Sequence, residues 1–289
     1  MMANVLLGFP NYADKYVLAG GSWSASLPLT LLQDRRISKR ARSSNVLTAS
    51  TQFTVTLDRL RSTAVIAIAG HNLSASSRYR IRASDNAGFS TIAYDSGWLD
   101  VWTDTLDPLT GGLEWEDDNF WLMKMTSQEA AYYPGLLLHI LNPIKACLYW
   151  KIEIDDTSNP AGYIDIGRLI FADAWQPESN YSYGWSIAYE DSTGVEDALG
   201  GAEYFDDRPR YRVIRMTLDH ISRSESMRQA LGLSRVLGVS GEVLVISDPS
   251  EKENLMRTSF LARPRSLSPL ENPDPSRYSS AFEFKEIIA

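Results

Sequence analysis

The sequence has few of the residues on which several classes of function depend. Its 289 residues include a single cysteine and only three histidines, His71, His139 and His220. One cysteine cannot form a disulfide within the chain, so we expect a fold without this cross-link. The histidines stand far apart and none lies four residues from a second metal ligand, so the zinc spacing typical of helices is absent. The sequence also lacks a Gly-x-Ser-x-Gly motif, a phosphate-binding loop and a dinucleotide-binding motif.

Long apolar runs and an excess of positive charge are missing too. Residues 1–10 lack a basic segment followed by a long apolar stretch, and Pro10 interrupts them, so we expect neither a signal peptide nor a membrane span. The formal net charge of -8 argues against a general nucleic-acid-binding protein. One basic segment stands out, and we expect it to form either a solvated face or a contact between subunits. It contains Arg35, Arg36 and Arg40.

Short segments of alternating polarity, separated by turn residues, dominate the chain as far as Trp175. Residues 52–57, 78–84 and 148–154 alternate between apolar and polar side chains, and residues 64–69 form a continuous apolar run. A period of two is typical of half-buried strands, and a short apolar run bounded by glycine fits a strand covered on both faces. This part of the sequence therefore predicts an all-β sandwich in which helices are short or absent.

A different pattern follows, with a strand expected at residues 211–218 and a helix after it. Ser222 and Glu225 have the spacing of a capping box, in which Glu225 reaches back to the helix start, and Gly238 suits the helix end. The helix is expected to bury Met227, Ala230, Leu231 and Leu237. Further strands are expected at residues 242–246, 259–263 and 282–287. The sequence thus predicts an N-terminal arm (1–20), a β-sandwich (21–178) and a small α+β unit (179–289).

Paired carboxylates at Asp155 and Asp156 leave three interpretations open: turn formation, a calcium ion or a glycosidase site. The neighbouring residues 157–160 form a turn-like sequence that explains them, because Asp and Asn cap turns with their own side chains. Their spacing does not match an EF-hand loop, and the sequence identifies no acid/base pair for glycoside hydrolysis. We therefore expect no catalytic residue, no cofactor and no metal ion, and the protein is not expected to be an enzyme.

Four tryptophans accompany an acidic segment, residues 101–119, that is expected to be a surface loop. Trp98 and Trp102 flank its start, and Trp115 and Trp121 lie within it or just beyond it. Their rings could pin the loop to the sandwich, anchor a protein interface, or stack on a sugar. The sequence leaves these three roles open, and the four tryptophans form the candidate recognition loop.

The strand segments carry a family resemblance. Residues 50–57, 66–74, 79–84 and 94–98 (Tyr-Asp-Ser-Gly-Trp), together with 149–156 and 162–169, resemble the galactose-binding-like (discoidin-type) jelly roll found in phage tail proteins. The part after residue 178 is similar to tail-tip proteins that continue into an assembly domain. The resemblance implies a mainly β fold, a jelly-roll sandwich followed by a small α+β C-terminal assembly domain.

The same resemblance implies a structural role in the tail tip or baseplate of a siphophage, comparable to distal tail proteins. Such a protein forms or joins a ring of three or six copies between the tail tube and the adhesion apparatus, in contact with other tail-tip or hub proteins. It would be made and assembled in the host bacterial cytoplasm and end in the virion tail. In the ring, the basic segment could meet the acidic loop of a neighbour. The alternative function is a carbohydrate-binding module that recognises a host surface glycan.

Overall fold

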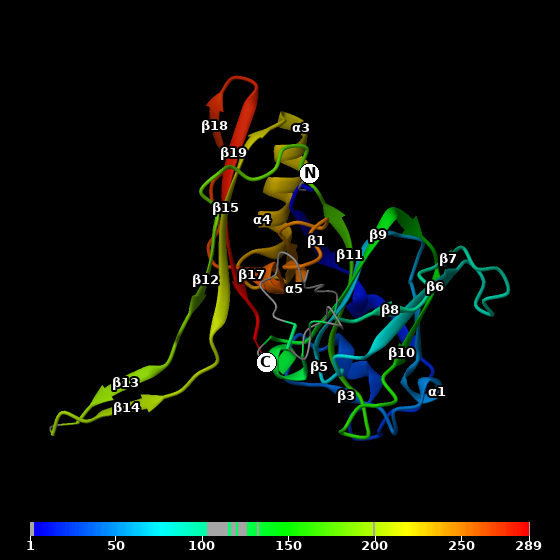
Figure 1. Cartoon of the computed structure of the whole chain (residues 1–289). Coiled ribbons are helices and arrows are strands. Elements are labelled where there is room, and N and C mark those ends of the chain that lie inside the picture. The colour runs from blue at the N-terminus through cyan, green and yellow to red at the C-terminus, as the bar shows by residue number, and fades with distance from the viewer. Residues whose placement is uncertain are drawn as a thin grey trace.

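The computed structural model describes residues 3–102, 115–116, 120, 126–131, 133–198 and 200–288, apart from the side chains of residues 127 and 131. The chain is mainly β, and a small and a large antiparallel sheet pack face to face as a sandwich (Figure 1). The small sheet has the order β2-β4-β10-β6-β7, with β8 beside β6. Its strands are β2 (Val17–Ala19), β4 (Phe53–Thr56), β6 (Arg78–Ser84), β7 (Tyr94–Asp95), β8 (Leu99–Asp100) and β10 (Tyr149–Asp155).

The large sheet has the order β12-β15-β19-β17-β16-β1-β11-β5-β9, with β18 beside β19 and β3 beside β11. It therefore continues from the sandwich into the C-terminal part of the chain without a break. Its strands are β1 (Leu6–Asn11), β3 (Ala41–Arg42), β5 (Ser62–His71), β9 (Leu136–Ala146), β11 (Asp165–Trp175), β12 (Ser186–Glu190), β15 (Tyr211–Ile221), β16 (Val243–Ile246), β17 (Ser259–Pro264), β18 (Glu271–Asp274) and β19 (Arg277–Glu286).

Helices are short throughout the described residues, as the sequence predicts for the sandwich. The longest continuous helical segment runs from residue 223 to residue 237, and it lies against one face of the large sheet (Figure 1). None of the described helices is long and apolar enough to span a bilayer. The helical elements are η1 (Ala13–Lys15), η2 (Leu29–Gln33), α1 (Thr48–Thr51), α2 (Ser127–Ala131), α3 (Arg223–Glu225), the π-helical η3 (Ser226–Ala230), α4 (Leu231–Leu237) and α5 (Leu255–Thr258).

The sandwich core confirms the predicted alternation. Phe53 of β4, Ile81 of β6 and Trp150 of β10 are completely buried and face the large sheet, where Ile68 of β5 and Phe171 of β11 meet them. The rings of Trp150 and Phe171 meet edge to face, with centroids 5.9 Å apart. Burying large apolar side chains from both sheets is the main force that holds such a sandwich together.

A second core lies on the opposite face of the large sheet, beneath the helical segment. The two central strands serve both cores: Leu6 of β1 and Ile246 of β16 pair and face the sandwich, whereas the next pair, Leu7 and Val245, faces the helix. This explains why both strands are continuous apolar runs, because neither face meets water. Residues 1–20, expected as an arm, thus contain a central strand; the domain division itself stays a prediction.

The helical segment starts as the sequence predicts, with one difference at its cap. The Ser222 hydroxyl accepts a hydrogen bond from the Glu225 amide (3.4 Å), and the helix ends at Gly238, whose φ is +54°. The Glu225 carboxylate does not return to Ser222. It accepts hydrogen bonds from the Trp175 indole (2.8 Å) and the Glu178 amide (3.2 Å) instead, and so ties the helix to the end of β11.

The predicted buried face of the helix is partly wrong. Ala230 and Leu237 are buried as expected, but Met227 and Leu231 have 45% and 49% of their surface exposed. The buried positions Ser226, Ala230, Leu233 and Leu237 follow one another at the regular spacing of three or four residues, so Met227 and Leu231 fall on the flank of this face. Leu233, which the prediction left out, takes the inward position assigned to Leu231.

Candidate functional site

A two-stranded hairpin projects from the body of the protein. Strands β13 (Gly194–Asp197) and β14 (Glu203–Asp206) continue outward from β12 and β15 (Figure 1). Val195 and Phe205 face each other across the hairpin, with 56% and 58% of their surfaces exposed, and Tyr204 is 66% exposed. None of the three belongs to either hydrophobic core. The hairpin therefore presents large apolar side chains to solvent on a slender support.

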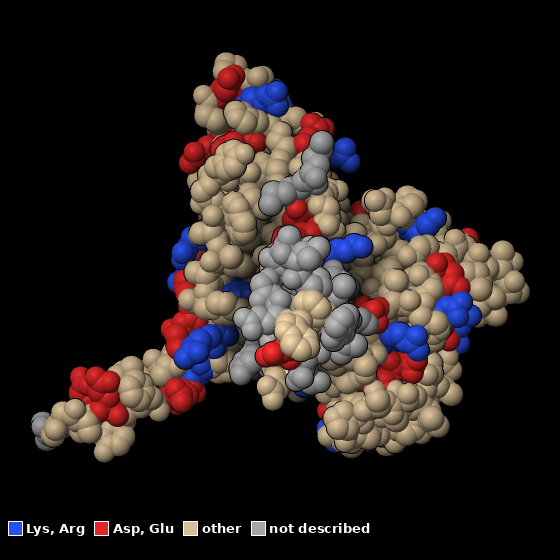
Figure 2. All heavy atoms as spheres, in the orientation of Figure 1, with Lys and Arg blue, Asp and Glu red and all other residues tan. Residues whose placement is uncertain are grey.

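The hairpin is also acidic. Residues 194–206 contain Glu196, Asp197, Glu203 and Asp206 and no lysine or arginine. Figure 2 shows acidic side chains towards the far end of the projection, where Asp197 of β13 pairs with Glu203 of β14. Of the four, only Asp206 has an ion pair within the described residues, with Arg208 at 2.8 Å. The hairpin thus combines exposed apolar rings with unpaired negative charge.

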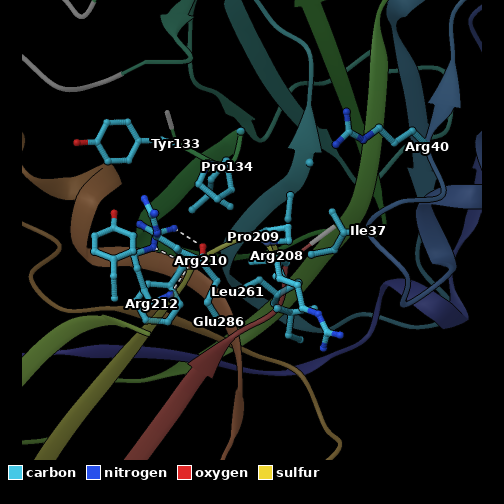
Figure 3. A pocket seen from close by; sticks show the side chains of 18 of the residues that line it. Ile37, Arg40, Tyr133, Pro134, Arg208, Pro209, Arg210, Arg212, Leu261 and Glu286 are labelled. Carbon is cyan, nitrogen blue, oxygen red and sulfur yellow. Dashed lines mark hydrogen bonds and ion pairs between the residues drawn. The ribbon is translucent and has the colours of Figure 1, made fainter. Parts of the chain in front are cut away.

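A groove of about 970 Å³ lies between the sandwich and the C-terminal strands, at the base of the hairpin (Figure 3). One wall comes from the segment before β3 and from the start of β9, the other from β19, β17 and the residues that lead into β15. Its lining mixes apolar and cationic side chains with two acidic ones, Asp207 and Glu286. The apolar and cationic side chains include Ile37, Arg40, Tyr133, Pro134, Tyr189, Arg208, Arg210, Arg212, Leu261 and Ile287.

Arg212 supports the groove instead of offering a free charge. Its guanidinium is buried and pairs with Glu286 of β19 (Nη2 to Oε1, 2.5 Å). It also donates to the Met256 carbonyl (2.8 Å) and lies 4.7 Å from the centre of the Phe260 ring. Because these contacts occupy its donors, Arg212 joins β15, β17 and β19 beneath the groove.

The three arginines of the expected subunit contact have different surroundings. Arg36 pairs with Asp34 (3.0 Å), whose pKa this arginine and Lys39 hold far below its usual range. Arg40 lines the groove, and within the described residues neither Arg35 nor Arg40 has an ion pair. The segment therefore contributes one cation, Arg40, to the groove. Its role as a subunit contact stays a prediction.

The four candidate tryptophans do not form one surface. Trp102 is buried, meets the His71 ring edge to face (centroids 5.7 Å apart), and donates to the Leu73 carbonyl (3.4 Å). This ring pins the chain to the sandwich. Trp98 and Trp115 are exposed, by 39% and 70%. Trp121 and most of the acidic segment 101–119 lie outside the described residues, so the predicted contact between this loop and the basic segment stays a prediction.

Trp98 has charged neighbours on the outer side of the small sheet. The Arg78 guanidinium lies 5.9 Å from the centre of its ring and pairs with Asp155 (2.9 Å). Arg80 pairs with Asp95 in the same region and keeps the pKa of this carboxyl at about 2. Here an exposed aromatic ring stands beside groups that could hydrogen-bond a polar ligand.

The paired carboxylates, Asp155 and Asp156, have separate structural roles. Asp155 belongs to the ion pair with Arg78, whereas Asp156 is buried and accepts hydrogen bonds from the Ser74 amide (2.9 Å) and the Asn159 side chain (2.8 Å). The turn interpretation accounts for Asp156. Across the described part of the chain, no group of three or more His, Cys, Asp or Glu residues is arranged to hold a metal ion.

Two of the histidines are structural. His139 bridges the hydroxyls of Tyr79 (3.1 Å) and Tyr94 (2.8 Å), and burial lowers its pKa to about 4. Burial, with a smaller contribution from Arg40, lowers the pKa of His71 to about 3, and its Nδ1 accepts from the Leu73 amide (3.2 Å). Both rings are therefore neutral near pH 7.

No protein-family model and no curated protein matches the sequence. Solved structures resemble part of the chain. They include the family 32 carbohydrate-binding module of Clostridium perfringens NanJ in complex with galactose (14% identity, 58% of this chain and 99% of that one, TM-score 0.38). Another is the first family 32 module of a C. perfringens family 31 glycoside hydrolase (10% identity, 57% of this chain and 99% of that one, TM-score 0.37). A third is chitosan-binding module 1 of a Paenibacillus chitosanase/glucanase (12% identity, 57% of this chain and 100% of that one, TM-score 0.34).

These three structures are of carbohydrate-binding modules. At such TM-scores the likeness assigns no ligand to this chain. The hairpin and the groove were not foreseen from the sequence. The available signal was a pair of short segments, Val195–Glu196 and Tyr204–Phe205, on either side of Gly200-Gly201, which is the pattern of a hairpin with apolar strands.

Proposed function

We propose that the protein is a structural, self-associating subunit of the tail tip of a long-tailed bacteriophage. In this role it forms or joins a ring of three or six copies between the tail tube and the adhesion apparatus, and it contacts other tail-tip or hub proteins. The proposal includes no enzymatic activity. It places the protein in the virion tail, after assembly in the host bacterial cytoplasm.

The observation that supports self-association is the projecting hairpin, with Val195, Tyr204 and Phe205 exposed outside both cores. A two-stranded hairpin is only marginally stable in water on its own. Clustered apolar side chains on a protein surface usually mark an interaction site. A hairpin of this composition becomes more stable when another protein chain covers its apolar side chains. In an assembly, a neighbouring subunit can provide that cover.

The test is the assembly state of the full chain. Sedimentation velocity over a range of protein concentrations should show a defined oligomer, and negative-stain electron microscopy should show closed rings. A protein that stays monomeric at every concentration, at both low and physiological salt, would contradict the proposal.

A second candidate function is glycan binding by the sandwich, and the surface around Trp98 favours it. An exposed ring can stack on a sugar face while Arg78 and Asp155 hydrogen-bond its hydroxyls. Calorimetric titration with galactose, preceded by a glycan array, would test this function. Trp98→Ala should abolish binding, and Tyr183→Ala should not, because Tyr183 is a fully exposed ring outside the sandwich. Equal binding by both variants would exclude the Trp98 site.

A further inference from the structure

The hairpin points away from the groove of its own chain. Thr193, directly before β13, and Asp207 and Arg208, directly after β14, line the groove. From there the strands run outward from the body (Figure 1). The opposed pair Val195 and Phe205 therefore lies beyond the groove, and it belongs to neither core of the described residues.

The groove offers surfaces that complement the hairpin. Tyr189, which is 61% exposed, and the half-buried Ile287 give it an apolar lining above the buried Ile37 and Leu261, and Arg40 adds a cation with no ion pair among the described residues. Two other groove arginines are already neutralised within the chain, Arg212 by Glu286 (2.5 Å) and Arg210 by Asp191 (3.1 Å). Arg208 is paired as well, with Asp206 (2.8 Å), so Arg40 is the groove arginine without an ion pair among the described residues, while Asp207 adds a carboxylate on the other wall.

The hairpin supplies apolar side chains and negative charge. Val195 and Phe205 can enter an apolar lining, and on the same short strands Glu196, Asp197 and Glu203 carry no ion pair within the described residues. Charge complementarity selects partners and accelerates their encounter, while the buried apolar side chains supply most of the binding energy.

We propose that the β13–β14 hairpin of one copy binds in the groove of a second copy, with its acidic side chains against Arg40. This inference rests on the proposed function, because it names the contact through which the subunits associate. Hairpin and groove are different surfaces of the same chain, so the contact is heterologous. An open row of copies keeps one free hairpin at one end and one free groove at the other until a ring closes.

Two sets of substitutions in the full chain test the contact, one in the hairpin and one in the groove. The hairpin variant is Val195→Ser with Phe205→Ser, and the groove variant is Arg40→Glu, with Arg40→Ala as a milder form. All of these positions are exposed or half-buried, so folding should be preserved and can be checked by circular dichroism. The matched controls are Val239→Ser with Leu267→Ser, equally exposed apolar residues elsewhere, and Arg59→Glu, an exposed arginine outside the groove.

Sedimentation velocity should show that either variant weakens self-association by about tenfold or more, while both controls assemble as the unchanged protein does. Raising the salt concentration should weaken the unchanged protein's assembly as well. The decisive sample is a mixture of the two variants. The intact groove of one and the intact hairpin of the other should form a one-to-one dimer that cannot grow further.

The outcomes separate this inference from the proposed function. A protein that assembles, but whose hairpin and groove variants assemble equally well, overturns the inference and leaves the proposed function standing. The absence of the one-to-one dimer in the mixture also overturns it. A monomeric unchanged protein contradicts the proposed function itself.

Discussion

Arg168 and Glu242 form an almost completely buried ion pair, with 2.8 Å between Nη2 and Oε2. Arg168 lies on β11, within the sandwich, and Glu242 directly precedes β16, so the pair joins the two halves of the large sheet. Arg168 also pairs with Asp14, from the segment that follows β1. One guanidinium thus connects three parts of the chain that are far apart in sequence.

Removing one partner of this pair should be costly. We expect Glu242→Gln to lower the free energy of unfolding by about 3 kcal/mol, because Arg168 then loses one of its two carboxylates in a buried place. Urea denaturation followed by tryptophan fluorescence measures this change. The double variant Arg168→Met with Glu242→Leu should lose much less than the sum of its two single variants. Additive losses would mean that the two residues are not coupled.

The neutral histidines make stability depend on pH. Burial lowers the pKa of His139 to about 4 and that of His71 to about 3, whereas the unfolded value is about 6.5. Below pH 6.5 the unfolded chain therefore binds more protons than the folded one. Stability should fall as the pH falls from 6.5 towards 4, by up to about 1.4 kcal/mol per pH unit for each histidine.

Urea denaturation between pH 7 and pH 5 measures this dependence in a range where unfolded carboxyl groups are still mostly ionised. The variant His71→Asn with His139→Gln keeps polar groups at both places but cannot take up the protons, so its slope should be much flatter. His220→Asn is the control. His220 is exposed and has a φ of +62°, which Asn tolerates, so this substitution removes an imidazole without touching either buried site.

Replacing Trp102 should lower the free energy of unfolding far more than replacing Trp98. Trp102→Ala removes a ring that is only 5% exposed, and we expect a loss of about 3–5 kcal/mol. Trp98→Ala removes a ring that is 39% exposed and outside the core, and it should change the free energy of unfolding by no more than about 0.5 kcal/mol. Thermal and urea unfolding of the two variants provide the comparison. Similar losses for both would show that Trp98 is also part of the packing.

The helix cap offers a local test. Ser222→Ala removes the acceptor of the Glu225 amide and should destabilise the protein by about 1 kcal/mol. Ser222→Asp retains an acceptor at the same place, so its unfolding curve should overlay that of the unchanged protein. If Ala and Asp behave alike, the hydroxyl does not contribute to the cap.

Local sequence patterns correctly predicted those strands and helix ends whose burial depends only on the residue's position within its own element. Phe53 and Val55 alternate with threonines on β4, and Ser222 with Gly238 marks the two ends of the helix. Met227 and Leu231 were placed wrongly because the face that packs on the sheet is formed by Ala230, Leu233 and Leu237, and apolar residues occur on other faces of the helix as well. Glu225 was wrongly assigned to the cap, because the indole of Trp175 competes for its carboxylate only in the folded chain.

The candidate site was less predictable, for a different physical reason. Arg40 was singled out by its charge, but its place in a groove depends on Leu261 and Ile287, which lie more than two hundred residues further along the chain. Likewise, Val195 and Phe205 become notable only because nothing in the described fold covers them. Exposure and concavity are properties of the tertiary structure, and a periodic pattern carries no information about them.

The position of β1 decides how this protein can be divided. Leu7 is paired with Trp175 on one side and with Val245 on the other, so the first strand of the chain closes the gap between β11 and β16. A fragment spanning residues 21–178 would leave the backbone donors and acceptors of β11 open along that side. Such an unpaired strand is a template for the strands of other molecules. The excised sandwich would therefore be prone to aggregate, unless residues 6–11 are supplied with it.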